Sequence, residues 1–135
     1  EFVLIKKKPI FGICVGMQLF SDQGFEEEVT KGFGWIKGYV KKIKLNNKDL
    51  KLPHMGWNAV KPKNNSLFEG VEDNTQFYFV HSYFIEYNPT FDIAAVNYGN
   101  KFSAAIQKDN FYGVQFHTEK SAKVGDQILS NFLSI

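Results

Sequence analysis

The feature that most constrains this chain is an apolar run that ends in a cysteine flanked by glycines. Residues 9–13 (Pro-Ile-Phe-Gly-Ile) predict a short buried strand, and residues 15–20 predict the first turns of a helix. Cys14 stands at the junction, on a tight strand-to-helix turn of the kind that presents a nucleophile. Gly12 and Gly16 are expected to remove side chains where strand and helix crowd together. Open α/β sheets bind ligands at the carboxyl ends of their strands, so Cys14 is a candidate nucleophile.

A second segment, near the C-terminus, supplies a candidate base. Residues 115–121 are Gln-Phe-His-Thr-Glu-Lys-Ser, and in an extended segment His117 and Glu119 point to the same side. Glu119 can then fix the tautomer of His117, which can take the proton of the Cys14 thiol. We expect the helix N-terminus to favour the thiolate, and the backbone N–H of Val15 to point where an oxyanion would form.

Each of these residues also has a plainer interpretation. A lone cysteine in a soluble protein is most often a small buried hydrophobic residue, and a lone histidine is most often structural. The two complete segments, in this order along one chain, outweigh those interpretations. Together they predict covalent acyl transfer by Cys14, His117 and Glu119.

The chain order Cys, His, Glu resembles the triad of the class I glutamine amidotransferases. Segments 51–58, 77–84 and 113–121 further resemble the glutaminase subunits of imidazole glycerol phosphate synthases. Within them the hexapeptide 53–58 (Pro-His-Met-Gly-Trp-Asn) is the most discriminating, because sibling amidotransferases usually lack it. The resemblance runs from about Pro9 to the C-terminus. It implies an open three-layer α/β sandwich of the flavodoxin-like type, hydrolysis of glutamine to glutamate and ammonia, and no cofactor.

The resemblance also implies a partner. Ammonia would pass to a cyclase of (β/α)₈-barrel fold for imidazole glycerol phosphate synthesis in histidine biosynthesis, so we expect a heterodimer. An exposed Trp57 would suit a docking anchor, although a core position is the default for tryptophan. Five residues match positions expected at or near that interface: Met55, Trp57, Asn58, Tyr78 and Lys120.

Four further residues match positions that hold the substrate glutamine in this family. Gln18 lies one helical turn beyond Cys14 and can face the same pocket, although it could also be an exposed helix glutamine. Glu26 matches a loop carboxylate that meets the substrate amino group, and a solvated acidic loop is almost as plausible. Ser82 and Tyr83 match the segment whose backbone cradles the bound glutamine.

Two departures from the family pattern stand out. The family usually has proline where Thr118 stands; threonine frees φ and adds an N–H donor, and we expect a minor effect. The family's first strands, with a glycine loop that donates a second oxyanion N–H, would precede the elbow. Only thirteen residues precede Cys14, so we expect the chain to be an N-terminally incomplete portion of a longer protein.

Composition fits one domain over residues 1–135. The chain is 44% hydrophobic and 16% aromatic, enough for one core, and its formal charge is only +2. Its lysines are dispersed, which favours a solvated face and argues against a nucleic-acid partner. One cysteine excludes an internal disulfide and suits a reducing cytoplasm. We see no membrane-spanning stretch, and His54 and His81 lack metal-ligand spacing, so we expect no metal and a structural or interface role for both.

Strand-like stretches recur between turn residues, and the C-terminus differs. From about Ser121 onward, apolar residues recur at helical spacing and predict an amphipathic helix whose stripe is core. The whole indicates an open α/β sheet. The predicted strands are 36–43, 76–81, 93–97, 102–107 and 111–116, and the stripe is Val124, Ile128, Leu129, Phe132 and Leu133.

Three alternatives remain open. The nearest is a paralogous amidotransferase that supplies ammonia to a sugar-aminating or other synthase, because the triad makes ammonia identically in both. A generic cysteine hydrolase is the second, and Gln18 and the hexapeptide 53–58 argue against it. A catalytically silent binding protein is the third, and the intact Cys14, His117 and Glu119 argue against it.

Overall fold

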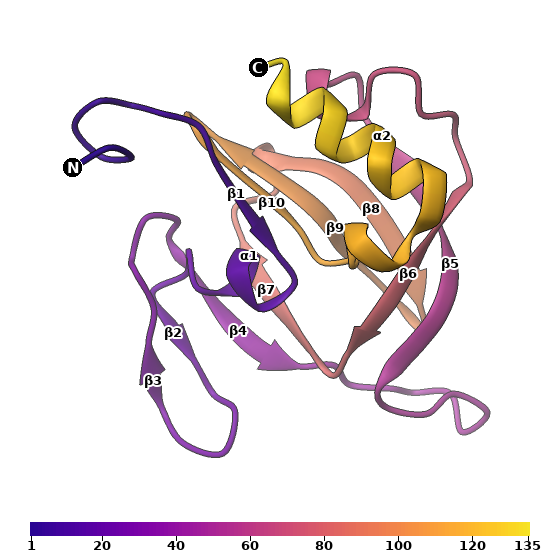
Figure 1. The fold of residues 1–135 in the computed structure, drawn as a ribbon. Helices are drawn as coiled ribbons and strands as arrows, with labels where there is room; N and C mark the ends of the chain where they lie inside the picture. The colour runs from indigo at the N-terminus through magenta and orange to yellow at the C-terminus, as the bar shows by residue number, and fades with distance from the viewer.

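The computed structural model describes residues 1–135. Strands dominate it, and only two α-helices occur (Figure 1). The α-helices and strands are β1 (Ile10–Ile13), α1 (Val15–Gln18), β2 (Gln23–Gly24), β3 (Thr30–Lys31), β4 (Gly38–Lys42), β5 (His54–Pro62), β6 (Thr75–His81), β7 (Tyr83–Tyr87), β8 (Asp92–Tyr98), β9 (Asn100–Lys108), β10 (Phe111–Val114) and α2 (Ala122–Leu133). Three short 3₁₀ turns complete the order: η1 (Ser66–Phe68), η2 (Pro89–Phe91) and η3 (Thr118–Lys120).

Two sheets form the mixed α/β fold. The larger has the strand order β1-β10-β9-β8-β5-β6, and the smaller has the order β3-β2-β4-β7. In the larger sheet only β1 and β10 are parallel, with Ile13 opposite Val114. Helix α2 lies across one face of this sheet, and α1 lies beside the smaller sheet (Figure 1). Because β1 and β10 are parallel neighbours, the segments that follow them emerge at the same edge.

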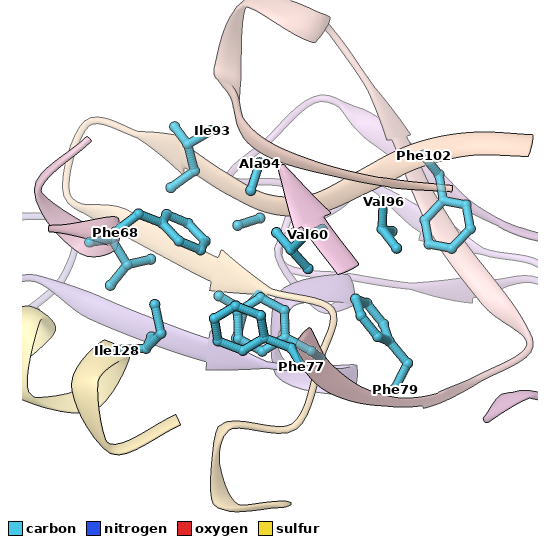
Figure 2. Packing of buried hydrophobic residues seen from close by; sticks show 14 of the residues in the cluster. Val60, Phe68, Phe77, Phe79, Ile93, Ala94, Val96, Phe102 and Ile128 are labelled. Carbon is cyan, nitrogen blue, oxygen red and sulfur yellow. The ribbon is translucent and has the colours of Figure 1, made fainter. Parts of the chain in front are cut away.

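The core lies mainly beneath α2. A cluster of 16 buried residues fills this space, and Figure 2 shows Val60, Phe77 and Ile128, from β5, β6 and α2, within it. A second cluster, of seven buried residues, joins α1, β4 and β7 to β9 and β10. The predicted stripe of α2 is confirmed at Ile128, which is fully buried, but it is wrong at Leu133, which is 84% exposed at the helix end.

The five strands predicted from sequence are all present as β4, β6, β8, β9 and β10. The sequence did not predict β5 or β7. Strand β5 pairs with β6 from His54, opposite His81, to Val60, opposite Thr75, although Gly56 has φ of +116° within it. Glycine tolerates that backbone geometry, and the mixture of polar and small residues in β5 hides the usual apolar alternation.

Neither α-helix has the length and apolarity that crossing a bilayer requires.

Candidate active site

Cys14 sits on a strained turn between β1 and α1. Its backbone has φ of +53° and ψ of −107°, a region that residues with a Cβ rarely adopt, and its N–H donates to the Val114 carbonyl at 2.8 Å. Gly12 is required here, because a Cβ on it would lie 2.6 Å from the backbone of Gly16. The same expectation is wrong for Gly16, where an added Cβ would meet no protein atom within 4 Å. The space above Gly16 is open.

The thiol of Cys14 is buried and held by polar groups. Gln115 Nε2 donates to Sγ at 3.6 Å, and Sγ lies 3.9 Å from the Val80 carbonyl oxygen. Burial raises the pKa of the Cys14 thiol and outweighs the nearby Val15 N–H and the Gln115 amide, which lower it. The expectation that the helix N-terminus favours the thiolate is therefore wrong, because α1 has only four residues and desolvation dominates. In the resting protein Cys14 is a thiol that needs a base.

His117 and Glu119 lie just beyond β10 and contact each other. Glu119 Oε1 accepts a hydrogen bond from His117 Nδ1 at 2.5 Å, as the two-residue spacing predicts. Burial alone would raise the pKa of the Glu119 carboxyl, but its backbone N–H and His117 outweigh that effect and lower it. With Nδ1 donating to Glu119, neutral His117 has its Nε2 free to accept a proton. No hydrogen bond joins His117 to Cys14 in this structure, where the thiol is bonded to Gln115 and Val80 instead.

Main-chain bonds to the edge strand β6 fix the base segment. The His117 N–H donates to the Tyr78 carbonyl at 2.9 Å, and the Tyr78 N–H donates to Ser121 Oγ at 3.0 Å. Ser121 Oγ in turn donates to the His117 carbonyl at 2.6 Å. Ser121, which is fully buried, therefore ties His117 to β6.

Residues predicted to bind substrate meet at one cavity beside the elbow. It has a volume of about 440 Å³, and Val15, Gln18 and Glu26 are among its lining residues. Gln18 Nε2 donates to the Tyr83 carbonyl at 3.0 Å, so Tyr83 contacts this site through its backbone. The carbonyl of Ser82, in contrast, accepts from Ile43 N at 2.9 Å, and Ser82 is not among the lining residues.

Four of the five predicted interface residues gather on one surface. This surface, here called the Trp57 face, comprises Met55, Trp57, Tyr78 and Lys120. Met55 is 60% exposed and Trp57 51% exposed, so the core default for Trp57 is wrong. Tyr78 stands opposite Trp57, with ring centroids 6.0 Å apart, and Lys120 Nζ lies 5.9 Å from the Tyr78 ring centroid.

The fifth residue, Asn58, is not part of the Trp57 face. Successive side chains of a strand point to opposite faces, and Asn58 shares its face with His54 rather than with Trp57. Its Nδ2 lies 3.0 Å from His54 Nε2 and donates to the Asn97 carbonyl at 2.9 Å. The prediction grouped it with Trp57 by sequence proximity alone.

Sequence reasoning gave no role to Gln115, which proves central. It is fully buried, donates to Cys14 Sγ, and accepts from Gln18 Nε2 at 3.1 Å. The only signal in the sequence was a polar residue between Val114 and Phe116 in an otherwise apolar strand end. Nowhere do His, Cys, Asp and Glu side chains form a group of three that could hold a metal ion.

The comparison with known proteins now identifies the class. The family model described as glutamine amidotransferase class-I matches residues 2–135. The chain belongs to this family. Two solved structures share the fold: a GMP synthase protein from Thermoplasma acidophilum (TM-score 0.64, 23% identity, 93% of this chain and 56% of that chain) and a glutamine amidotransferase from Thermotoga maritima (TM-score 0.60, 18% identity, 98% and 50%). The predicted fold class is confirmed.

Among curated proteins, the chain is similar to subunit HisH of imidazole glycerol phosphate synthase. It is 46% identical to that of Pelagibacter ubique over 137 residues, covering 100% of this chain and 66% of the relative. It is 49% identical to that of Salmonella typhimurium over 130 residues, covering 95% and 64%. The chain thus spans about two thirds of the length of these relatives, and the resemblance drawn from the hexapeptide 53–58 is confirmed.

Proposed function

We propose that this chain carries the glutaminase site of an imidazole glycerol phosphate synthase, with Cys14, His117 and Glu119 as its triad. The observation that carries the proposal is the parallel pairing of β1 with β10. It brings the strained elbow at Cys14 and the hydrogen-bonded His117–Glu119 pair to the same edge of the sheet. Gln18 and the 440 Å³ cavity lie beside that edge, which suits a substrate of amino-acid size.

The residues divide the work as follows. Cys14 Sγ attacks the side-chain amide carbon of glutamine, and His117 Nε2 takes the thiol proton, because the raised pKa of Cys14 leaves it protonated at rest. The C–N bond breaks as His117 returns the proton to the leaving ammonia. Water then adds to the glutamyl thioester, the C–S bond breaks, and glutamate and the Cys14 thiol are released. Glu119 holds the tautomer of His117 throughout.

Oxyanion stabilisation falls in part to Val15. Its backbone N–H lies close enough to Sγ to lower the pKa of Cys14, which places that donor beside the carbon under attack. Glu26, at the rim of the cavity, offers a carboxylate to the substrate ammonium group.

The second half of the proposal concerns the partner. The curated relatives are named as subunits of a synthase, and the Trp57 face exposes a Met and a Trp next to the segment that carries His117. Large exposed side chains of this kind are common at the centre of protein interfaces. We infer that the Trp57 face docks a (β/α)₈-barrel cyclase in the cytoplasm, which uses the ammonia in imidazole glycerol phosphate synthesis for histidine.

The test uses the complete protein with its cyclase partner. Cys14→Ala should abolish glutamine-dependent synthesis but leave synthesis from added ammonium intact, because the cyclase performs that step. A chloroketone analogue of glutamine should label Cys14 and no other residue. Glutamate release that persists in Cys14→Ala would refute the assignment of the nucleophile, and loss of the ammonium-dependent reaction would show that the variant no longer docks its partner.

A further inference from the structure

A line of buried hydrogen bonds runs from β5 to the glutamine cavity. His54 and His81 are 2% and 7% exposed, and His54 Nδ1 lies 2.9 Å from His81 Nε2. His81 Nδ1 lies 2.8 Å from the Tyr83 carbonyl oxygen, and Asn58 Nδ2 lies 3.0 Å from His54 Nε2. None of these side chains belongs to the triad or lines the cavity.

The partners at each end fix the direction of every bond in the line. A carbonyl can only accept, so His81 Nδ1 carries a proton and donates to Tyr83. Neutral His81 then accepts at Nε2, which makes His54 Nδ1 a donor and leaves His54 Nε2 to accept from the Asn58 amide. Burial lowers the pKa of both rings to about 4, so both are neutral at pH 7, as this order requires.

The line continues to the reactive thiol. The Tyr83 carbonyl also accepts from Gln18 Nε2 at 3.0 Å, so one carbonyl is held by His81 and holds Gln18. Gln18 Nε2 also donates to Gln115 Oε1 at 3.1 Å, and Gln115 Nε2 donates to Cys14 Sγ at 3.6 Å. Both protons of the Gln18 amide are therefore used, and its orientation at the cavity is set from behind.

We propose that His54 and His81 are positioning residues for substrate glutamine: they hold the Tyr83 carbonyl, which orients the Gln18 amide in the cavity. The inference rests on the proposed glutaminase function and adds a determinant of glutamine affinity outside the cavity. Protonating or removing either ring would release the carbonyl, and Gln18 would lose one of its two acceptors. The loss falls on substrate binding, since the triad is fixed independently by β6 and by the β1–β10 pairing.

The experiment measures kcat and KM for glutamate release by the complete protein with its partner. His81→Phe removes both ring nitrogens and should raise KM for glutamine about three- to tenfold, as expected for one lost hydrogen bond, with kcat changed less than about twofold. His81→Asn keeps a donor near the position of Nδ1 and should return KM to within about twofold of the unmodified protein.

Tyr87→Phe is the matched control. Tyr87 lies on β7, as Tyr83 does, and its hydroxyl donates to Asp92 Oδ1 at 3.0 Å, but it makes no bond to Gln18 or the histidines. A merely structural effect would lower kcat with the folded fraction and leave KM unchanged in both variants. If His81→Phe is insoluble, His54→Phe carries the same test, because that ring stacks on Phe79 and Tyr98, at centroid distances of 4.7 and 4.1 Å, and a phenyl ring suits the site.

Two outcomes overturn the inference and remain distinct. An unmodified protein without glutaminase activity would refute the proposed function on which it rests. An active protein whose KM is unchanged by His81→Phe and His54→Phe, or raised equally by Tyr87→Phe, would refute the positioning role alone.

Discussion

Replacing Thr118 with proline should stabilise this protein rather than disturb its site. Thr118 is 1% exposed, and its Oγ1 is a buried oxygen without a hydrogen-bond partner. It is the first residue of η3, where its N–H meets no backbone acceptor. The preceding His117 has φ of −89° and ψ of +107°, an extended conformation that a following proline accepts. Proline at 118 therefore costs no hydrogen bond.

The magnitude follows from two contributions. A buried hydroxyl left unpaired costs about 1–3 kcal/mol, which Thr118→Pro removes. Restricting the unfolded chain at a compatible position adds about 0.4–1 kcal/mol. Allowing for imperfect repacking around the ring, we expect the free energy of unfolding to rise by about 1–3 kcal/mol. Glutaminase activity should stay within about threefold, because the backbone bonds that hold His117 do not involve residue 118.

Urea unfolding near neutral pH measures this change, with Thr118→Val as the control. Valine removes the hydroxyl but leaves the backbone unrestricted, so it should recover the first contribution and not the second. A destabilised Thr118→Val would show that the hydroxyl is in fact bonded, and a Thr118→Pro protein less stable than the original would refute the reasoning about the backbone.

Three further predictions concern the elbow and the histidines. Iodoacetamide should alkylate Cys14 slowly at about pH 7, and the rate should rise with pH until above about pH 9, because burial raises the pKa of the thiol and only the thiolate reacts. Gly12→Ala should cost about 1–3 kcal/mol of stability and most of the activity, since its Cβ would lie 2.6 Å from the Gly16 backbone; a matched Gly16→Ala should change stability by less than about 1 kcal/mol, as measured by urea unfolding. Acid should destabilise the fold between about pH 6.5 and pH 4, because His54 and His81 have pKa values lowered to about 4 and stay neutral while the unfolded chain takes up protons.

For the acid prediction, each ring contributes up to about 3 kcal/mol, fully present above about pH 6.5 and lost by about pH 4. His54→Phe should flatten the slope of unfolding free energy against pH in that window, and an unchanged slope would contradict it. Alkylation of Cys14 at a rate independent of pH between about 6 and 9 would contradict the raised pKa. Equal losses in Gly12→Ala and Gly16→Ala would contradict the difference in crowding.

Local pattern predicted the elements near the site, and long-range pairing decided the rest. The elbow at Cys14 and the His117–Glu119 contact follow from short spacings, so sequence reasoning placed them correctly. The state of the thiol did not follow, because its pKa depends on burial by Gln115 and β6, segments remote in the chain. Strand β5 was missed because its partners, not its composition, make it a strand.

The fate of the predicted binding residues has the same cause. Spacing placed Gln18 at the cavity correctly, since residues four apart along a helix share one side. Strand alternation, had β5 been recognised, would have put Asn58 on the face opposite Trp57. The buried line through His54 and His81 joins residues of β5, β6 and β7, and no local pattern announces it.

The bonds between His117 and β6 separate two kinds of change at one residue. The backbone of Tyr78 receives and donates the bonds that locate the proposed base, whereas its side chain faces Trp57 and Lys120 on the surface. Substituting that side chain can therefore alter which partner is recognised without moving the imidazole. Related proteins could in this way acquire new synthase partners while the ammonia-producing chemistry remained constant.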